Sequence, residues 1–195
     1  MTTRSPSSLP CPVAKSRRTE DREARPGGLT HIDELGHAHM VDVTSKPLTR
    51  RIATARCSVV TEADAGEVLR SASDGLDVVE AARVAGVQAA KQTAALIPLC
   101  HAIALHAIGV KVEVGVHRID ISATAEIVER TGVEMEALTA CAVTALALLP
   151  VLLAADPGAS VEDLTLWHKS GGRSGVWERR GPKADMRHGM EGAES

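Results

Sequence analysis

The chain has 195 residues, of which 44% are apolar and 24% charged, a composition that excludes disordered and fibrous proteins and predicts one globular domain. Its net charge of -3 and pI of about 6.2 provide no overall basic field, so we expect no nucleic-acid partner. Phe and Tyr are absent, so Ala, Val, Leu and Ile must build the core. The four cysteines, which contain no CxxC pair, are expected to be reduced thiols: Cys11, Cys57, Cys100 and Cys141.

Both ends of the chain lack a periodic pattern. Residues 1–28 are rich in Ser, Pro, Arg and Glu and end in Pro-Gly-Gly, and residues 182–195 are equally polar, so we predict disordered tails around a domain at 29–181. The first segment holds no apolar stretch of signal-peptide length, and the longest apolar run, 145–155, is shorter than a membrane span. We therefore expect a cytoplasmic protein without membrane contact.

The first predicted elements are a strand and a helix. Residues 52–60 have the pattern of a strand that ends at the polar stretch 61–64. A D-x-x-E sequence, Asp77 to Glu80, is typical of a helix start and predicts an alanine-rich helix to about residue 93, before Pro98. The small residues of this helix would allow a neighbouring element to approach closely.

A hairpin, a second helix and a last strand follow. Apolar residues alternate with other residues over 108–116 and again over 119–127, which predicts two half-buried strands joined near His117. Thr131 and Glu134 form a T-x-x-E capping box that predicts a helix to about residue 155, and 164–167 predicts a strand. This order predicts an α+β fold of the ferredoxin-like βαββαβ type, an antiparallel sheet with two helices on one face.

Three polar groups interrupt the apolar segments. Cys100 and His101 follow the turn at Pro98, where an imidazole could hold phosphate or move a proton, or simply be hydrogen-bonded in a packed turn. Glu134 is explained by the capping box, so Glu136 is the better functional candidate. Lys169 and Arg173 flank a glycine turn that could hold an anion.

Two further interpretations stay open. Lys91, in the last turn of the first helix, either stabilises the helix dipole or binds phosphate. A metal site is the competing interpretation. Its candidate ligands are Cys100, His101, His106 and Cys141, or His37 and His39. No pair of them has the usual ligand spacing, so we expect neither a metal nor a cofactor.

Together these segments resemble the MoaC family, the cyclic pyranopterin monophosphate synthases of molybdenum cofactor biosynthesis. The stretches that carry the resemblance occur in family order and span nearly all of residues 29–175: LTHIDELGHAHMVDVTSK at 29–46, ARVAGVQAAKQT and LIPLCH between 82 and 101, TGVEMEALTA at 131–140 and KSGGRSG at 169–175.

The resemblance implies a ferredoxin-like protomer in a homohexamer, a trimer of dimers, with active sites at subunit interfaces. The implied substrate is 3′,8-cyclo-7,8-dihydro-GTP, which is rearranged to cyclic pyranopterin monophosphate with release of diphosphate. The implied catalytic residues are His101, Glu136 and Lys169. The implied pocket contains Leu99, Cys100, His101, Met135 and Glu136, and the implied phosphate-facing residues are Lys91, Lys169, His39 and Arg51.

The sequence departs from the family in two places. Where the family carries an Asp and, one turn later, a catalytic Lys, an ungapped alignment gives Pro150 and Leu153. The family also has a catalytic Lys in the loop before the first helix, whereas residues 71–77 of this chain contain none. The alternative function is therefore a non-catalytic paralogue that binds a nucleotide or pterin, or that joins a mixed oligomer with an active relative.

Overall fold

The computed structural model describes residues 31, 36–72 and 77–180. The two predicted tails, 1–28 and 182–195, and residues 73–76 of the loop before the first predicted helix lie outside these ranges. The chain divides into two compact units between Ala38 and His39. All the helices and strands described below belong to the second unit.

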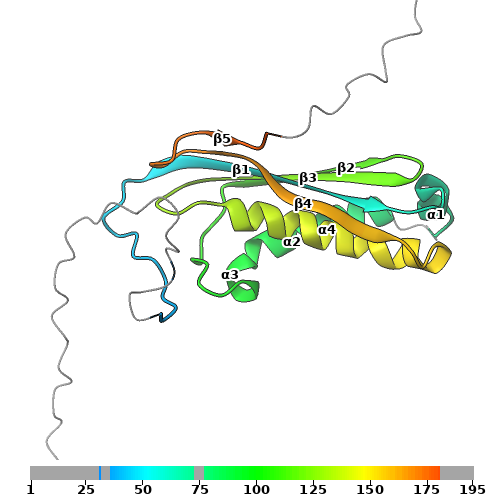
Figure 1. The fold of residues 1–195 in the computed structure, drawn as a ribbon, viewed down its shortest axis with the longest axis horizontal. Helices are drawn as coiled ribbons and strands as arrows, with labels where there is room; N and C mark the ends of the chain where they lie inside the picture. Colours follow the sequence, from blue (N-terminus) through cyan, green and yellow to red (C-terminus); the bar gives the residue numbers. More distant parts are fainter. Residues whose placement is uncertain (1–30, 32–35, 73–76, 181–195) are drawn as a thin grey trace, which may run out of the picture. The chain divides into compact units, whose positions relative to one another are not determined.

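An antiparallel sheet of five strands forms one layer (Figure 1). Its strands are β1 (Thr49–Val60), β2 (Ala107–Val114), β3 (Arg118–Glu129), β4 (Ser160–Ser170) and the short β5 (Trp177–Glu178). Their order is β2-β3-β1-β4-β5, and every neighbouring pair is antiparallel. The hairpin lies where it was predicted, closed by a 2.8 Å hydrogen bond from the Gly115 N–H to the Arg118 carbonyl. The first four strands have the order of a ferredoxin-like sheet, so the predicted fold class is confirmed.

The long helices α2 (Val78–Lys91) and α4 (Glu134–Ala155) pack on one face of the sheet (Figure 1). The start of α2 is as predicted, since the Asp77 carboxylate accepts hydrogen bonds of 3.0 Å from the N–H groups of Val79 and Glu80. The capping box predicted at Thr131 is wrong. The N-cap of α4 is Val133, no side chain caps the helix, and the Glu134 carboxylate turns instead toward Lys169.

Three short elements escaped prediction: α1 (Ala65–Ser71), α3 (Thr93–Leu96) and β5. Elements of two to seven residues are too short to show a repeated apolar pattern. The Asp64 side chain nevertheless caps α1 by accepting a 2.9 Å hydrogen bond from the Glu67 N–H.

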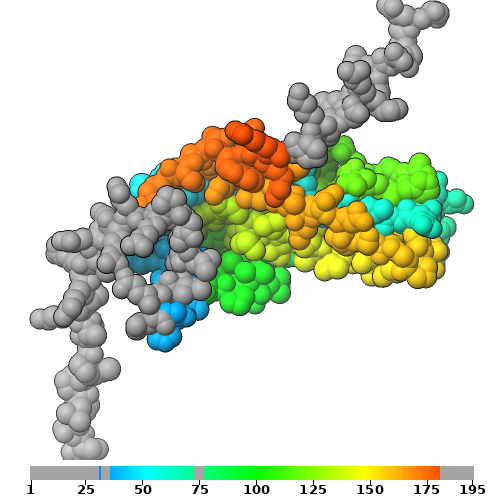
Figure 2. All heavy atoms as spheres, viewed as in Figure 1, coloured from blue at the N-terminus to red at the C-terminus, as the bar shows by residue number. Residues whose placement is uncertain are grey.

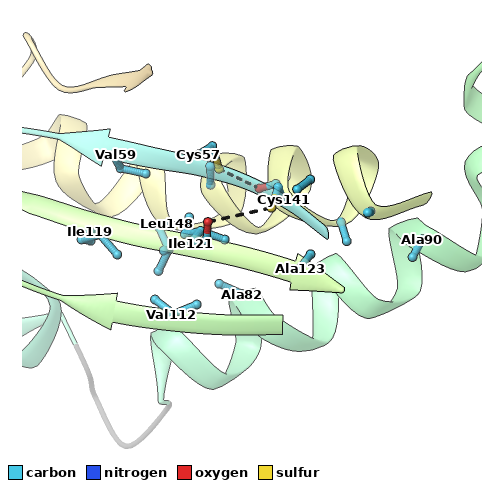
Figure 3. Packing of buried hydrophobic residues seen from close by; sticks show 14 of the residues in the cluster. Cys57, Val59, Ala82, Ala90, Val112, Ile119, Ile121, Ala123, Cys141 and Leu148 are labelled. Atoms are coloured by element: carbon cyan, nitrogen blue, oxygen red, sulfur yellow. Dashed lines mark hydrogen bonds between the residues drawn. The ribbon is translucent and has the colours of Figure 1, made fainter. Parts of the chain in front are cut away.

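Small side chains let α4 lie close against the sheet and against α2. The sheet residues that face the helices include Ala53, Ala55 and Ala123, all at most 1% exposed, and Figure 3 shows Ala123 among them. At Gly86 of α2, an added Cβ would lie 2.0 Å from the Thr144 hydroxyl of α4, so only glycine permits this helix crossing. The core of a chain without Phe and Tyr is therefore built by close backbone approach.

Helix α4 is strongly apolar and only partly buried. Within the described residues it is the one helix that is long and apolar enough to cross a membrane, although the apolar run 145–155 covers only its second half. A core helix meets the same two criteria, and α4 packs against α2, β1, β3 and β4. Leu146 and Leu153 on its outer side are 57% and 38% exposed, and α4 reaches the molecular surface beside β4 (Figure 2).

Candidate active site

Most of the predicted site residues lie near one end of the sheet. There β1 begins opposite the ends of β3 and β4, with Thr49 paired to Glu129 and Ile52 paired to Ser170. Helix α4 starts five residues after β3 ends, so its first turn lies at the same end.

A β-bulge directs Lys169 into this site. In the pairing of β1 with β4, Thr54 lies opposite His168 and Ala55 opposite Leu166, so Trp167 is the extra residue of a bulge. The bulge shifts the alternation of β4, and Leu166 and Lys169 both face the helices. Without it, Lys169 would lie on the opposite face of the sheet from Leu166.

Lys169 forms an ion pair with Glu134 in the first turn of α4. The Nζ to Oε1 distance is 3.3 Å, and the two side chains are 32% and 31% exposed. Gly132 makes room for the Glu134 carboxylate, because a Cβ there would lie 1.8 Å from Glu134 Oε2. The ion pair holds the ammonium group at the site without burying it completely.

Glu136 is a buried carboxyl beside this pair. It is 4% exposed, and burial, together with the charge of Glu134, raises its pKa above the ordinary value against an opposing backbone hydrogen bond. Burial also raises the pKa of the Cys100 thiol, and the charge of Glu136 adds to that effect, which places Cys100 near Glu136. A carboxyl with a raised pKa can donate or accept a proton nearer neutral pH, whereas Cys100 is disfavoured as a thiolate.

His101 is oriented by the chain segment before β1. Its Nε2 lies 3.0 Å from the carbonyl oxygen of Val41, a geometry in which Nε2 donates. Nδ1 is then the nitrogen that can accept a proton. Leu99, two residues before His101, has a φ of 66°, a left-handed conformation that costs a residue other than glycine about 1–2 kcal/mol and that fixes the direction of the following chain.

The glycine turn after Lys169 packs on the start of β1. A Cβ at Gly171 would lie 2.1 Å from the Arg50 carbonyl oxygen, and one at Gly172 would lie 2.4 Å from Arg51 Nη1. The Arg51 guanidinium donates to the carbonyl oxygens of Glu129 (2.9 Å) and Arg130 (3.0 Å). Arg51 therefore ties β1 to the end of β3, and its predicted contact with phosphate stays a prediction.

The remaining predicted residues are less constrained. The side chains of Lys91 and His39 are exposed and make no hydrogen bond or ion pair within the described part of the chain, and Met135 is 37% exposed. The alternative metal site does not form in the described ranges, where no three His, Cys, Asp or Glu side chains gather as ligands. Cys141 packs in the core with its Sγ 4.0 Å from the Ile121 carbonyl oxygen (Figure 3).

The sequence does not predict two features of the site, the position of the Glu134 side chain and the acceptor that orients His101. The T-x-x-E pattern predicts that Glu134 belongs to a capping box, whereas Gly132, two residues earlier, leaves space for its side chain to turn away from the helix end. The Val41 carbonyl that orients His101 carries no sequence signal, because any residue provides the same acceptor.

The altered positions Pro150 and Leu153 lie toward the other end of α4. Fourteen and seventeen residues separate them from Glu136, which corresponds to roughly 21 and 26 Å along a helix at about 1.5 Å per residue. The loop with no Lys contains residues 73–76, which are outside the described ranges. One copy of the chain therefore does not bring Pro150 or Leu153 to Glu136 in the first turn of α4.

Comparison with known proteins identifies the family to which the chain belongs. A sequence profile of the MoaC family matches residues 40–172. The chain is 46% identical over 168 residues to a protein of Mycobacterium bovis named cyclic pyranopterin monophosphate synthase 2, covering 85% of this chain and 99% of that protein. It is 48% identical over 164 residues to a cyclic pyranopterin monophosphate synthase of Thermomicrobium roseum, covering 80% of this chain and 96% of that one. From its profile match and these identities, the chain belongs to the MoaC family.

Proposed function

We propose that this protein is a cyclic pyranopterin monophosphate synthase that converts 3′,8-cyclo-7,8-dihydro-GTP to cyclic pyranopterin monophosphate and diphosphate in molybdenum cofactor biosynthesis in the cytoplasm. The observation that carries the proposal is the first turn of α4, where Lys169 forms an ion pair with Glu134 and the carboxyl of Glu136 is buried. This turn combines a cation with a carboxyl whose pKa is raised. His101 adds an imidazole oriented by the Val41 carbonyl, and its neighbour Cys100 is affected by the charge of Glu136. Relatives named for this reaction are 46–48% identical to the chain.

Lys169, Glu136 and His101 each have a role that their surroundings favour. Lys169 holds a phosphate of the substrate by exchanging part of its ion pair with Glu134 for a phosphate oxygen. Glu136 and His101 transfer protons during formation of the pterin ring, since one is a buried carboxyl and the other is an imidazole whose Nε2 is held by the Val41 carbonyl. Leu99, Cys100 and Met135 form the pocket wall, and Lys91, His39 and Arg51 supply further positive charge for the triphosphate.

A second copy of the chain completes the site. The separation of roughly 21–26 Å between Glu136 and the positions of Pro150 and Leu153 is too long for one substrate contact within a single copy. The exposed Leu146 and Leu153 on α4 provide an apolar contact surface for the other copy. We propose a homohexamer built as a trimer of dimers, in which each site combines the start of α4 from one copy with its far end from another.

The substitutions at Pro150 and Leu153 favour a second candidate function. Losing one proton-transfer group typically costs about 10²–10⁴ in rate, and neither side chain can replace an Asp or a Lys. Mycobacterium bovis has proteins named synthase 1 and synthase 2, so one organism can carry two relatives. The second candidate is a paralogue that binds a nucleotide or pterin, or that forms a mixed oligomer with an active relative.

A coupled assay separates the two functions. Purified protein receives enzymatically made 3′,8-cyclo-7,8-dihydro-GTP, and the product is followed by its fluorescence after oxidation. His101→Ala tests the site, and His117→Ala is the matched control, since the His117 Nδ1 also lies near a backbone carbonyl, 3.2 Å from that of Ala63, at the β2–β3 turn. Product that disappears with His101→Ala and persists with His117→Ala supports the synthase, whereas bound substrate without product supports the paralogue.

A further inference from the structure

The face of the sheet opposite the helices carries a hollow that the proposed reaction does not use. Its volume is about 840 Å³, within the range of roughly 300–1,000 Å³ of small-molecule pockets. Residues from β1, β2, β3, β4 and the segment after β5 line it. This face is distinct from the one that carries Lys169 and Glu136.

The hollow is positively charged in a protein whose net charge is -3. Five cationic side chains line it against three carboxylates, which leaves an excess of two positive charges; the cations are Arg56, Lys111, Arg118, Arg179 and Arg180. All three carboxylates are engaged: Glu113 with Lys111, and Asp120 and Asp163 with Arg118. No carboxylate in the described part of the chain forms an ion pair with the other three arginines.

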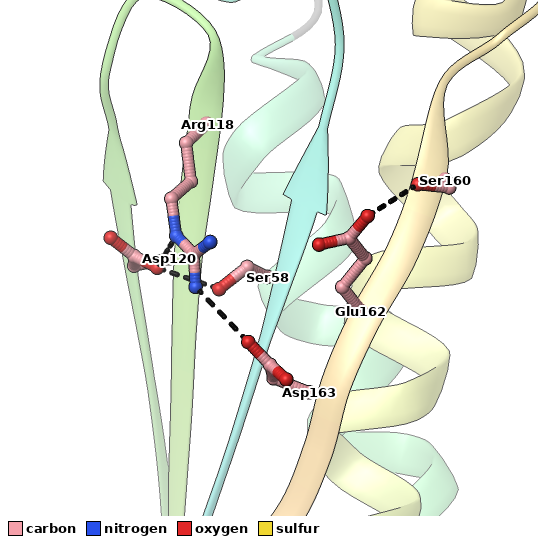
Figure 4. A network of polar contacts seen from close by, with 6 residues as sticks. All are labelled: Ser58, Arg118, Asp120, Ser160, Glu162 and Asp163. Atoms are coloured by element: carbon pink, nitrogen blue, oxygen red, sulfur yellow. Dashed lines mark hydrogen bonds and ion pairs between the residues drawn. The ribbon is translucent and has the colours of Figure 1, made fainter. Parts of the chain in front are cut away.

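A network of polar contacts joins residues that line the hollow, and it includes one buried hydroxyl and three exposed charged side chains (Figure 4). The Ser58 hydroxyl, in a residue only 3% exposed, donates a 2.7 Å hydrogen bond to Asp120 Oδ1, which also accepts from Arg118 Nε at 2.8 Å. Asp163 reaches Arg118 Nη2 at 3.7 Å from a left-handed backbone conformation, with φ of 54°, where β4 departs from regular pairing with β1. The Arg118 guanidinium is therefore held in place from two strands.

The bulge at Trp167 supplies a flat aromatic surface in the same hollow. It turns the Trp167 ring to the open face of the sheet, where the Arg56 guanidinium lies 4.5 Å from the ring centroid. A guanidinium stacked on an indole forms a planar cationic surface on which a heterocyclic ring can stack. Arg179, whose Nε donates to the Leu166 carbonyl at 2.9 Å, lines the hollow as well.

From these observations we propose that the hollow is a second ligand site, which binds a nucleoside phosphate. The base stacks against the Arg56–Trp167 pair, and the phosphates lie against Arg179 and Arg180. The site is independent of the synthase reaction, since its residues lie on the other face of the sheet from His101, Glu136 and Lys169.

Tryptophan fluorescence tests the proposal directly. The chain has two tryptophans, so Trp177→Phe leaves Trp167 as the sole emitter. Titration of this full-length variant with GTP is expected to quench the emission to saturation, while guanosine and inorganic triphosphate each bind at least roughly tenfold more weakly, because each lacks one half of the recognised ligand. Equal binding of triphosphate and GTP would refute the stacking of the base.

Variants separate this site from the candidate active site. Arg56→Gln and Arg179→Gln are each expected to raise the Kd for GTP by roughly tenfold, the effect of losing one charge-assisted contact. Arg56→Lys keeps the charge and loses the planar stack, so it is expected to weaken GTP and leave triphosphate binding unchanged. The matched control Arg83→Gln, on α2 at the helix side, and the variant His101→Ala are expected to leave the Kd unchanged.

Two results would overturn the proposal. One is quenching that persists unchanged in Arg56→Gln and Arg179→Gln, both shown to be folded by circular dichroism. The other is a Trp167 that acrylamide cannot quench in the native oligomer, which would mean that a second copy covers the hollow. Neither result affects the coupled assay of the synthase reaction, so the two proposals fail independently.

Discussion

Restoring the two family residues on α4 is expected to raise the synthase rate. The double variant Pro150→Asp/Leu153→Lys places a carboxylate and an ammonium three residues apart, on one face of the helix. Pro150 is exposed and Leu153 is 38% exposed, so both polar side chains can be accommodated without entering the core. Since one proton-transfer group contributes about 10²–10⁴ in rate, we expect kcat to rise at least about 100-fold.

The control must separate chemistry from stability. A proline in a helix interior costs about 3 kcal/mol relative to alanine, so its removal alone stabilises α4. Pro150→Ala/Leu153→Ala makes the same two removals without adding a functional group. Single-turnover rates in the coupled assay are compared between the two double variants, and equal rates in folded proteins would refute the reasoning.

Mixing then tests whether two copies share a site. A chain that carries Pro150→Asp, Leu153→Lys and His101→Ala has restored groups at the far end of α4 and a defective imidazole. Neither this variant nor the wild type has all of the catalytic groups by itself. A mixed oligomer would combine the restored Asp and Lys of one copy with the His101 of another. We expect mixtures refolded together to exceed both parents in rate; additive rates would place each site within one copy.

Three further predictions concern the site and the core. Lys169→Met is expected to lower kcat/KM at least about 100-fold, because a charge contact with the transition state is lost. The free energy of unfolding should change by about 1 kcal/mol or less, because the ion pair with Glu134 is partly exposed. An unchanged kcat/KM would contradict the role of the Lys169 ammonium group. Glu136→Gln removes a carboxyl whose pKa is raised by burial. The stability of the wild type relative to this variant should therefore be greatest below the ordinary carboxyl pKa and decline as the pH rises through the pKa of the folded state. Tm is measured for both proteins from pH 4 to 8, and parallel Tm curves would contradict the raised pKa of Glu136. Gly86→Ala should lower the free energy of unfolding in urea by about 1–3 kcal/mol through overpacking. Gly109→Ala should lower it less, because no atom lies within 4 Å of the added Cβ. The reverse order would contradict the close crossing of α2 and α4.

The fold was predictable because each long element carries a repeated pattern. The alternation over 108–116 and 119–127 gave both strands of the hairpin to within about two residues at each end. Asp77 marked the start of α2 through a local interaction that needs no tertiary contact. The start of α4 was misassigned because Glu134 has a stronger tertiary partner in Lys169, 35 residues away in the chain.

The candidate site was predictable in its residue types and not in its geometry. Glu136 was singled out because nothing local explained it, and its burial gives a physical reason for a functional carboxyl. The carbonyl of Val41 beside His101 and the left-handed φ of Leu99 arise from how distant segments meet, so no motif could reveal them.

The bulge at Trp167 connects the two faces of this protein. A regular β4 would alternate side chains strictly, and Leu166 and Lys169, three residues apart, would then point to opposite faces of the sheet. The extra residue lets both face the helices, so Lys169 reaches Glu134 while Trp167 turns out to meet Arg56. Deleting Trp167 should therefore remove the lysine from the candidate active site and the aromatic surface from the hollow in one step, whereas Trp167→Ala should affect the hollow alone. Synthase activity that survives the substitution and is lost on deletion is the outcome this geometry requires.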